Sequence, residues 1–152
     1  MSITRASHAE TVRATTQNCV DALLDFATYP QWQSAVKEAE VVGRDDDGAT
    51  TVAFAVDAKA RTVRYVLRYA QDGPARVAWT YVEGDLKHVE GDYVFEDLGD
   101  GTTRATYTVG IDPGRFVPGP VKRVLLEVVM KGSVRELRRR VEATSSPSTA
   151  AP

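Results

Sequence analysis

Residues 118–144 read PGPVKRVLLEVVMKGSVRELRRRVEAT, and this stretch decides how the rest of the chain must fold. Apolar side chains recur in it every three or four residues, which places them along one face of a single long helix. Prolines at positions 118 and 120 suit the first turn, because a residue there needs no N–H donor. Such a helix spans about 35 Å at 1.5 Å per residue. It therefore needs a wide apolar surface to cover it.

Four arginines gather near the end of this stretch, at positions 135, 138, 139 and 140. We expect them at the C-terminal end of the helix, where positive charge complements the helix dipole. The alternative is a basic patch that engages RNA with steep salt dependence. The net charge of −2 does not favour nucleic acid as a partner.

The middle of the chain supplies the covering surface as a series of short strands. In each strand apolar and polar residues alternate, and turns that contain Gly and Asp separate one strand from the next. This pattern predicts an antiparallel meander with one covered and one solvated face. The predicted strands are 36–42, 51–58, 62–69, 76–82, 86–95 and 102–111.

The segment before the meander predicts one further strand and two short helices. Residues 3–14 lack Gly and Pro and suit an extended strand. Thr15 or Thr16 is the expected N-cap of a helix that ends at Tyr29-Pro30. A short helical turn at 31–35 follows, with Trp32 as its anchor in the core. The fold class is therefore α+β: a curved antiparallel sheet wrapped around a long C-terminal helix, with two short helices after strand 1.

Length and composition set the domain organisation. A chain of 152 residues predicts one domain, for which we expect the bounds 1–144. The Ser/Pro/Ala-rich residues 145–152 are expected to form a disordered tail. Cys19 is the only cysteine, so no intrachain disulfide can form, and we expect a buried thiol.

The chain has neither an apolar leader nor a run of about 18 apolar residues. We therefore expect a cytoplasmic protein without stable membrane insertion.

Three stretches carry a resemblance to a known family: DFATYPQW at 25–32, WTYVEGD at 79–85 running to GDY at 91–93, and GTTRATY at 101–107. In these the chain resembles the START-like (SRPBCC) superfamily, and in particular its polyketide cyclase/dehydrase and lipid-transport branch, which includes coenzyme Q-binding proteins. The resemblance covers about residues 3–142. It implies a helix-grip fold with a cavity between the sheet and the C-terminal helix. It also implies an apolar ligand there: a lipid, an isoprenoid quinone, a polyketide or another aromatic.

The candidate ligand-binding residues lie on the covered face of the sheet and on the helix that closes it. Several are tyrosines, whose hydroxyls need partners when buried, so their number favours a partly polar pocket of roughly 300–1,000 Å³. The alternative is an ordinary packed core. The candidates are Phe54, Tyr65, Leu67, Trp79, Tyr81, Tyr93, Tyr107, Val124 and Val128.

Catalytic residues are harder to find in this sequence. A cyclase or dehydratase needs a base and a donor for an enolate oxygen. His88 is the only weak candidate, and strict alternation from Tyr93 turns it to the outer face. The acidic turn at 45–47 lacks the alternating ligands of a calcium loop, so we expect no metal, and no other cofactor motif is present.

The sequence therefore predicts a carrier or sensor that binds a small apolar or aromatic ligand, such as a lipid, a quinone or a polyketide-like molecule. The alternative is a polyketide cyclase/dehydratase-type enzyme that uses the same cavity. An uncovered edge strand could also support a homodimer.

Overall fold

The structure is a computed structural model that describes residues 3–58, 61–114, 119–120, 123 and 133–144. The expected tail at 145–152 and much of the expected long helix, including Val124 and Val128, lie outside the described residues.

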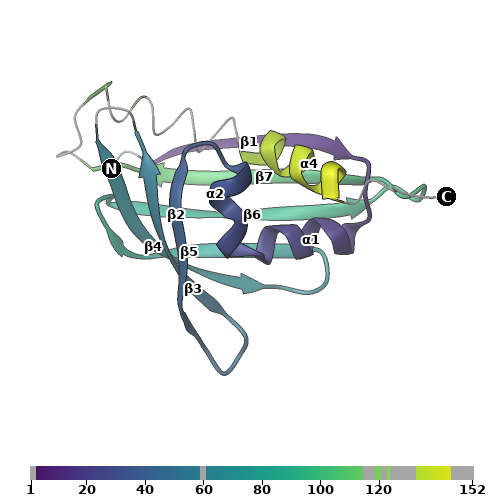
Figure 1. The fold of residues 1–152 in the computed structure, drawn as a ribbon, viewed down its shortest axis with the longest axis horizontal. Helices are drawn as coiled ribbons and strands as arrows, with labels where there is room; N and C mark the ends of the chain where they lie inside the picture. The colour runs from purple at the N-terminus through teal and green to yellow at the C-terminus, as the bar shows by residue number, and fades with distance from the viewer. Residues whose placement is uncertain (1–2, 59–60, 115–118, 121–122, 124–132, 145–152) are drawn as a thin grey trace.

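One curved antiparallel sheet dominates the part of the chain that is described (Figure 1). Its spatial order is β1-β7-β6-β5-β4-β3-β2, so consecutive strands from β2 to β7 are neighbours and β1 pairs with β7. This confirms the predicted α+β class and the meander. The strands are β1 (Thr4–Val12), β2 (Val36–Arg44), β3 (Thr50–Asp57), β4 (Thr62–Gln71), β5 (Arg76–Gly84), β6 (His88–Asp97) and β7 (Thr103–Asp112).

Irregular pairing bends one half of this sheet. The register shifts between Val36 and Glu38, and again between Val41 and Gly43, where β2 pairs with β3. A third shift lies between Val66 and Leu67, where β4 pairs with β5. Each bulge adds local twist and bends its strand. The bulges therefore contribute to the concave face that the helices cover.

The helices after β1 follow the prediction at their start but not at their end. Helix α1 (Thr16–Leu24) begins at the expected cap, where the Thr15 hydroxyl accepts a hydrogen bond from the amide of Asn18 at 3.2 Å. It ends five residues before Tyr29-Pro30. A 3₁₀ turn, η1 (Phe26–Thr28), and helix α2 (Tyr29–Trp32) follow. Pro30 lies in the first turn of α2, where its missing N–H is harmless, so it begins a helix here rather than breaking one.

The core anchor of this region is Tyr29 rather than the predicted Trp32. Tyr29 is buried, and its hydroxyl donates to the carbonyl oxygen of Leu23 at 2.5 Å. Trp32 is only half-buried and packs edge-on against the Tyr29 ring at 4.8 Å between centroids. Its indole N–H donates to the Thr28 hydroxyl at 3.1 Å, close to the surface.

The last described helix, α4 (Ser133–Thr144), packs on β1, α1 and β7 through the fully buried Val134, Leu137 and Val141. The predicted role of its arginines at the helix dipole is wrong, because the last turn contains no basic residue. Arg138 instead donates to Glu10 of β1 at 2.8 Å.

Two glutamates of α4 accept hydrogen bonds that connect this helix to other segments. Glu136 accepts hydrogen bonds from the amide and hydroxyl of Ser34, and Glu142 accepts one from the amide of Arg13. Helix α4 is therefore held by polar contacts on both sides of its apolar stripe. Beneath it, Cys19 is buried as expected, and burial raises the pKa of its thiol to about 11.

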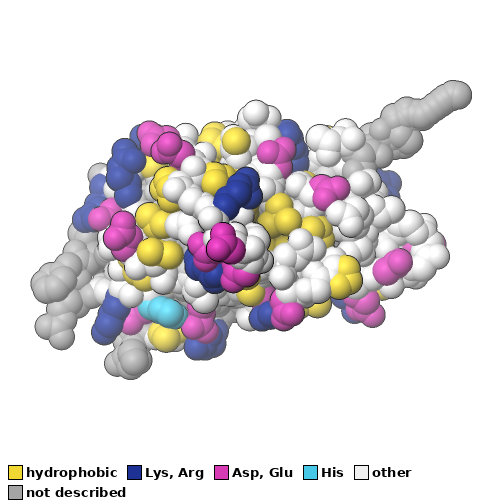
Figure 2. All heavy atoms as spheres, turned by 90° about the horizontal axis from the view of Figure 1, so that it is seen from below, with side chains coloured by type: hydrophobic (Ala, Val, Ile, Leu, Met, Phe, Trp, Pro, Cys, Tyr) yellow, Lys and Arg dark blue, Asp and Glu magenta, His cyan; other side chains and the backbone are white. Residues whose placement is uncertain are grey.

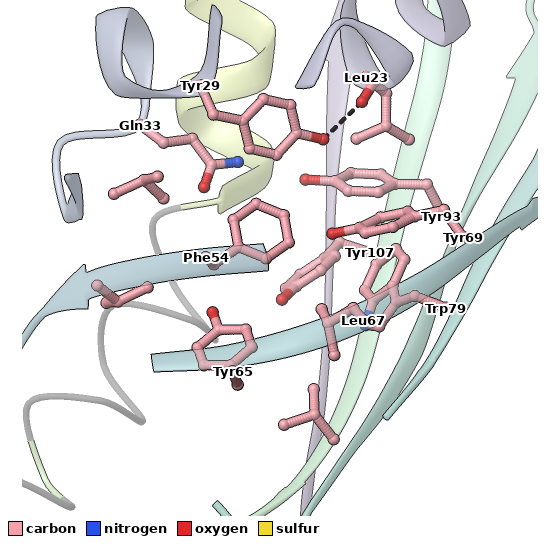
Figure 3. A pocket seen from close by; sticks show the side chains of 13 residues that line it. Leu23, Tyr29, Gln33, Phe54, Tyr65, Leu67, Tyr69, Trp79, Tyr93 and Tyr107 are labelled. Atoms are coloured by element: carbon pink, nitrogen blue, oxygen red, sulfur yellow. Dashed lines mark hydrogen bonds between the residues drawn. The ribbon is translucent and has the colours of Figure 1, made fainter. Parts of the chain in front are cut away.

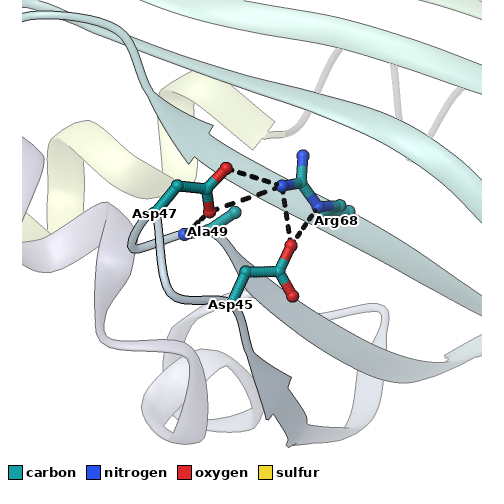
Figure 4. A network of polar contacts seen from close by, with 4 residues as sticks. All are labelled: Asp45, Asp47, Ala49 and Arg68. Carbon is teal, nitrogen blue, oxygen red and sulfur yellow. Dashed lines mark hydrogen bonds and ion pairs between the residues drawn. The ribbon is translucent and has the colours of Figure 1, made fainter.

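The acidic turn between β2 and β3 forms ion pairs with an arginine of β4. Arg68 donates to Asp45 at 2.7 Å and to Asp47 at 3.2 Å (Figure 4). Arg64 of the same strand pairs with Glu38 at 3.4 Å and is exposed. Figure 2 shows acidic and basic side chains interspersed with small hydrophobic areas on the face it draws.

Gly91 permits close packing inside the sheet. A Cβ atom at this position would lie 2.7 Å from the Trp79 indole and closer still to the carbonyl oxygen of Thr108. A glycine inside a strand marks either a bulge or a close approach by another group, and here it is a close approach, because the pairing of β6 with β7 is regular.

We therefore expect Gly91→Ala to lower the free energy of unfolding by about 1–3 kcal/mol through overpacking. The measurement is urea denaturation followed by circular dichroism. Gly43→Ala is the matched control, because a Cβ there meets only Thr51 at 4.0 Å. Equal effects of the two substitutions would contradict the close packing described for Gly91.

A second prediction concerns Glu10. Its hydrogen bond with His8 and the charge of Arg138 lower the pKa of this carboxyl below the ordinary value of a glutamate. A lowered folded-state pKa stabilises the protein above the unfolded-state value and loses that effect as the pH falls. Glu10→Gln should therefore destabilise the protein at pH 7, and the difference from wild type should shrink below about pH 4.5.

Thermal melts between pH 7 and pH 3 measure this difference. Glu96→Gln, at an exposed position of β6, serves as the control. A gap between wild type and Glu10→Gln that stays constant across this range would contradict the assignment.

Candidate functional site

A cavity of about 70 Å³ lies between the concave face of the sheet and the α1–α2 region (Figure 3). Strands β3 to β7 supply its floor. On the helical side the described lining comes from α1, α2 and the segment that leads into β2, and no described residue of α4 contributes. The lining residues are Leu23, Tyr29, Gln33, Val36, Phe54, Val56, Tyr65, Leu67, Tyr69, Trp79, Val89, Tyr93 and Tyr107.

The strand register places the aromatic lining residues opposite one another. Phe54 pairs with Tyr65, Tyr69 with Trp79, and Tyr93 with Tyr107. Because successive side chains of a strand point to opposite faces, each of these pairs projects into the same concave side. The alternation seen in the sequence thus becomes a continuous aromatic surface.

These rings touch across the sheet. Phe54 and Tyr65 lie 5.7 Å apart between centroids, Tyr69 and Trp79 5.5 Å, and Tyr93 and Tyr107 4.9 Å. Trp79 also stacks on Tyr107 at 5.7 Å with an interplanar angle of 27°. Offset and tilted arrangements of this kind are favourable for aromatic pairs.

The polar groups of the cavity fall into two kinds. Tyr29 is satisfied by its bond to Leu23. By contrast, the hydroxyls of Tyr65 and Tyr69 and the side-chain amide of Gln33 have no hydrogen-bond partner among the residues that the structure describes. Burial raises the pKa of both tyrosines, so both hydroxyls are neutral at physiological pH and can donate.

Six of the predicted residues line this cavity: Phe54, Tyr65, Leu67, Trp79, Tyr93 and Tyr107. Tyr81 does not line it. The register shift at Val66 and Leu67 lies opposite Tyr81, and the Tyr81 hydroxyl donates to the carbonyl oxygen of Leu86 at 2.6 Å. Val124 and Val128 lie outside the described residues.

Sequence reasoning left several lining residues out of the site. Tyr69 and Val56 share the alternation of their strands and could have been added on that signal alone. Tyr29 and Gln33 could not, because they depend on how α2 folds over the sheet. Leu23, Val36 and Val89 complete the group, and they read as ordinary core positions in the sequence.

His88, the one weak catalytic candidate, is not among the lining residues. It projects from the start of β6 on the outer face, as the alternation predicted, and its imidazole pairs with Glu90 at 2.8 Å. Glu90 also binds Arg5 of β1, and the two contacts lower the pKa of its carboxyl, the contact with Arg5 more than that with His88. His88 therefore belongs to a surface ion-pair cluster and faces away from the cavity.

The cavity is smaller than the roughly 300–1,000 Å³ expected from the sequence. The aromatic rings themselves fill the space between sheet and helices, which leaves about 70 Å³. A cavity of about 150 Å³ can hold benzene, so this one admits water but no ring without movement of its walls.

Two features are absent from the described residues. No group of three or more His, Cys, Asp or Glu side chains in them is arranged to hold a metal ion. None of the helices in that part of the chain is long and apolar enough to cross a membrane.

Residues 4–144 match the family described as polyketide cyclase / dehydrase and lipid transport, and the chain belongs to this family. No curated protein matches the sequence significantly. The family membership confirms the resemblance expected from the three sequence stretches.

Solved structures share the fold over nearly the whole chain. The Zhui aromatase/cyclase from Streptomyces sp. R1128 superposes with a TM-score of 0.82 at 17% identity, covering 99% of this chain and 100% of its own. A START superfamily protein from Mycobacterium smegmatis gives 0.79 at 22% identity, with 92% and 98% covered. Human STARD10 gives 0.70 at 14% identity, with 95% and 66% covered. These likenesses establish the START-like helix-grip fold.

The two kinds of tyrosine give a prediction about stability. Tyr29→Phe removes a buried hydrogen bond and leaves the Leu23 carbonyl without that donor, so it should cost about 1–3 kcal/mol. Tyr65→Phe removes a hydroxyl with no partner in the described structure and should cost about 0.5 kcal/mol or less. Urea denaturation of both variants measures the difference. A larger loss for Tyr65→Phe than for Tyr29→Phe would contradict these assignments.

Proposed function

We propose that the protein binds a small apolar or aromatic ligand in the cavity between the sheet and the helices, as a carrier or a sensor. The observation that carries this proposal is the aromatic floor formed by cross-strand ring pairs, together with the polar groups of Gln33, Tyr65 and Tyr69, which have no hydrogen-bond partner among the described residues. Ligand pockets commonly combine an apolar lining with a few placed polar groups. The lipid-transport part of the family description supports the same proposal.

Binding requires the cavity to widen. Its present volume of about 70 Å³ is below that of a single benzene site, so lining side chains must move apart when a ligand enters. Tyr65 stands at one end of the aromatic surface, where Phe54 is its one ring neighbour among the described residues, and Tyr65 is half-buried. This end of the lining can yield at a lower cost than the centre around Trp79, where rings pack on three sides.

The alternative, a cyclase/dehydratase-type enzyme, needs a proton acceptor beside the ligand. The described lining residues include no His, Asp, Glu, Lys or Cys, and His88 lies on the other face. Burial raises the pKa values of Tyr65 and Tyr69, so these two phenols are donors rather than bases. The described walls therefore favour binding over catalysis.

The test is a titration with N-phenyl-1-naphthylamine, whose fluorescence rises in apolar sites. We expect saturable binding by wild type and at least tenfold weaker binding by Val56→Phe, because the added ring fills the cavity. Val56 is buried in the lining, so overpacking should cost about 1–3 kcal/mol, and circular dichroism checks that the variant is folded.

Val94→Phe is the matched control, since Val94 is exposed on the outer face of β6. Native mass spectrometry of freshly purified protein, followed by organic extraction, identifies any ligand that is retained. The proposal fails if wild type shows no saturable binding, or if a folded Val56→Phe variant binds the probe as wild type does.

A further inference from the structure

We propose that Gln33 is a specificity-determining residue of the cavity: together with the Tyr65 hydroxyl, its amide selects aromatic ligands that carry a hydrogen-bonding oxygen over pure hydrocarbons. This inference rests on the proposed function and adds to it the chemistry by which the site chooses among apolar ligands.

Gln33 is held in place by its backbone. It follows the last residue of α2, and its amide N–H donates to the carbonyl oxygen of Tyr29 at 2.8 Å. Its side chain is half-buried and turns toward the cavity between Tyr29 and Phe54 (Figure 3). The side-chain amide carries two donor hydrogens and an acceptor oxygen, and within the described residues none of them is engaged. An apolar side chain at this position would line the cavity without any hydrogen-bonding group.

Tyr65 faces the same space from the sheet. Its ring packs on Phe54 at 5.7 Å, and its hydroxyl points from β4 toward the side of the cavity where Gln33 lies (Figure 3). The hydroxyl has no partner in the described part of the chain, and burial keeps it protonated at neutral pH. Gln33 and Tyr65 therefore present hydrogen-bonding groups from opposite walls, above and below the Phe54 ring.

These groups discriminate between ligands because a buried hydrogen-bonding group that loses its partner costs free energy. A cavity of about 70 Å³ has room for water, which can satisfy them while no ligand is bound. A hydrocarbon that displaces this water leaves the amide and the hydroxyl unpaired, whereas a phenol, quinone or ketone oxygen replaces the lost hydrogen bonds. A site built to hydrogen-bond a ligand rejects an analogue that lacks the polar atom.

The experiment compares two probes of nearly equal shape, 1-naphthol and 1-methylnaphthalene, by isothermal titration calorimetry. We expect wild type to bind 1-naphthol about 3- to 10-fold more tightly, the range that one net hydrogen bond supplies. In Gln33→Leu this preference should fall toward unity, mainly through weaker binding of 1-naphthol. Tyr65→Phe should reduce the preference in the same direction.

Gln71→Leu is the matched control, because Gln71 is exposed at the end of β4 and is not part of the lining. Equal affinity of wild type for both probes, or an unchanged preference in Gln33→Leu, would overturn this inference while leaving the proposed function intact. Binding of neither probe by wild type would overturn the proposed function, and this inference with it. Thermal melts of each variant show whether a loss of affinity reflects unfolding.

Discussion

The packing of the Trp79 indole over Gly91 is the contact on which the rest of the structure depends. Trp79 occupies the space that a side chain on β6 would take, and from there it touches Tyr69, Tyr93 and Tyr107. The Trp79 side chain of β5 thereby contacts three other strands, β4, β6 and β7, on the concave face. The aromatic surface that forms the cavity floor extends from this centre, so the site and the core of the protein share the same residues.

Much of the fold could be predicted from the alternation of apolar and polar residues, because a half-buried sheet imposes that period directly. The same pattern placed six lining residues correctly and turned His88 outward. Turn chemistry at Gly48 and Gly73 marked the hairpins, and both residues adopt positive φ. These features are local, which is why the sequence alone reveals them.

The remainder depends on how distant segments meet. The single residue Pro30 is compatible with either the end or the beginning of a helix, and only the packing of Tyr29 against Leu23 decides between them. The same packing of Tyr29 against Leu23 brings Gln33 to the cavity wall. Tyr81 does not line the cavity, because the pairing of β4 with β5 contains a bulge at Val66 and Leu67. No turn residue in the sequence marks this bulge. The predicted cavity volume was too large, because the strand pattern gives the directions of the rings but not how closely they pack.

The pairing of β1 with β7 has a consequence for synthesis on the ribosome. Thr4 lies opposite Ile111, and in the described structure β7 is the only strand beside β1. Strand β1 must therefore wait, unpaired, until residues 103–111 of β7 have been synthesised. Contacts of such long sequence separation slow folding, because the loop between them must close first. The hydrogen bonds between Glu142 and Arg13 and between Arg138 and Glu10 form later still, so the contacts of β1 are among the last to be completed, although the strands from β2 to β7 can pair in the order of their synthesis.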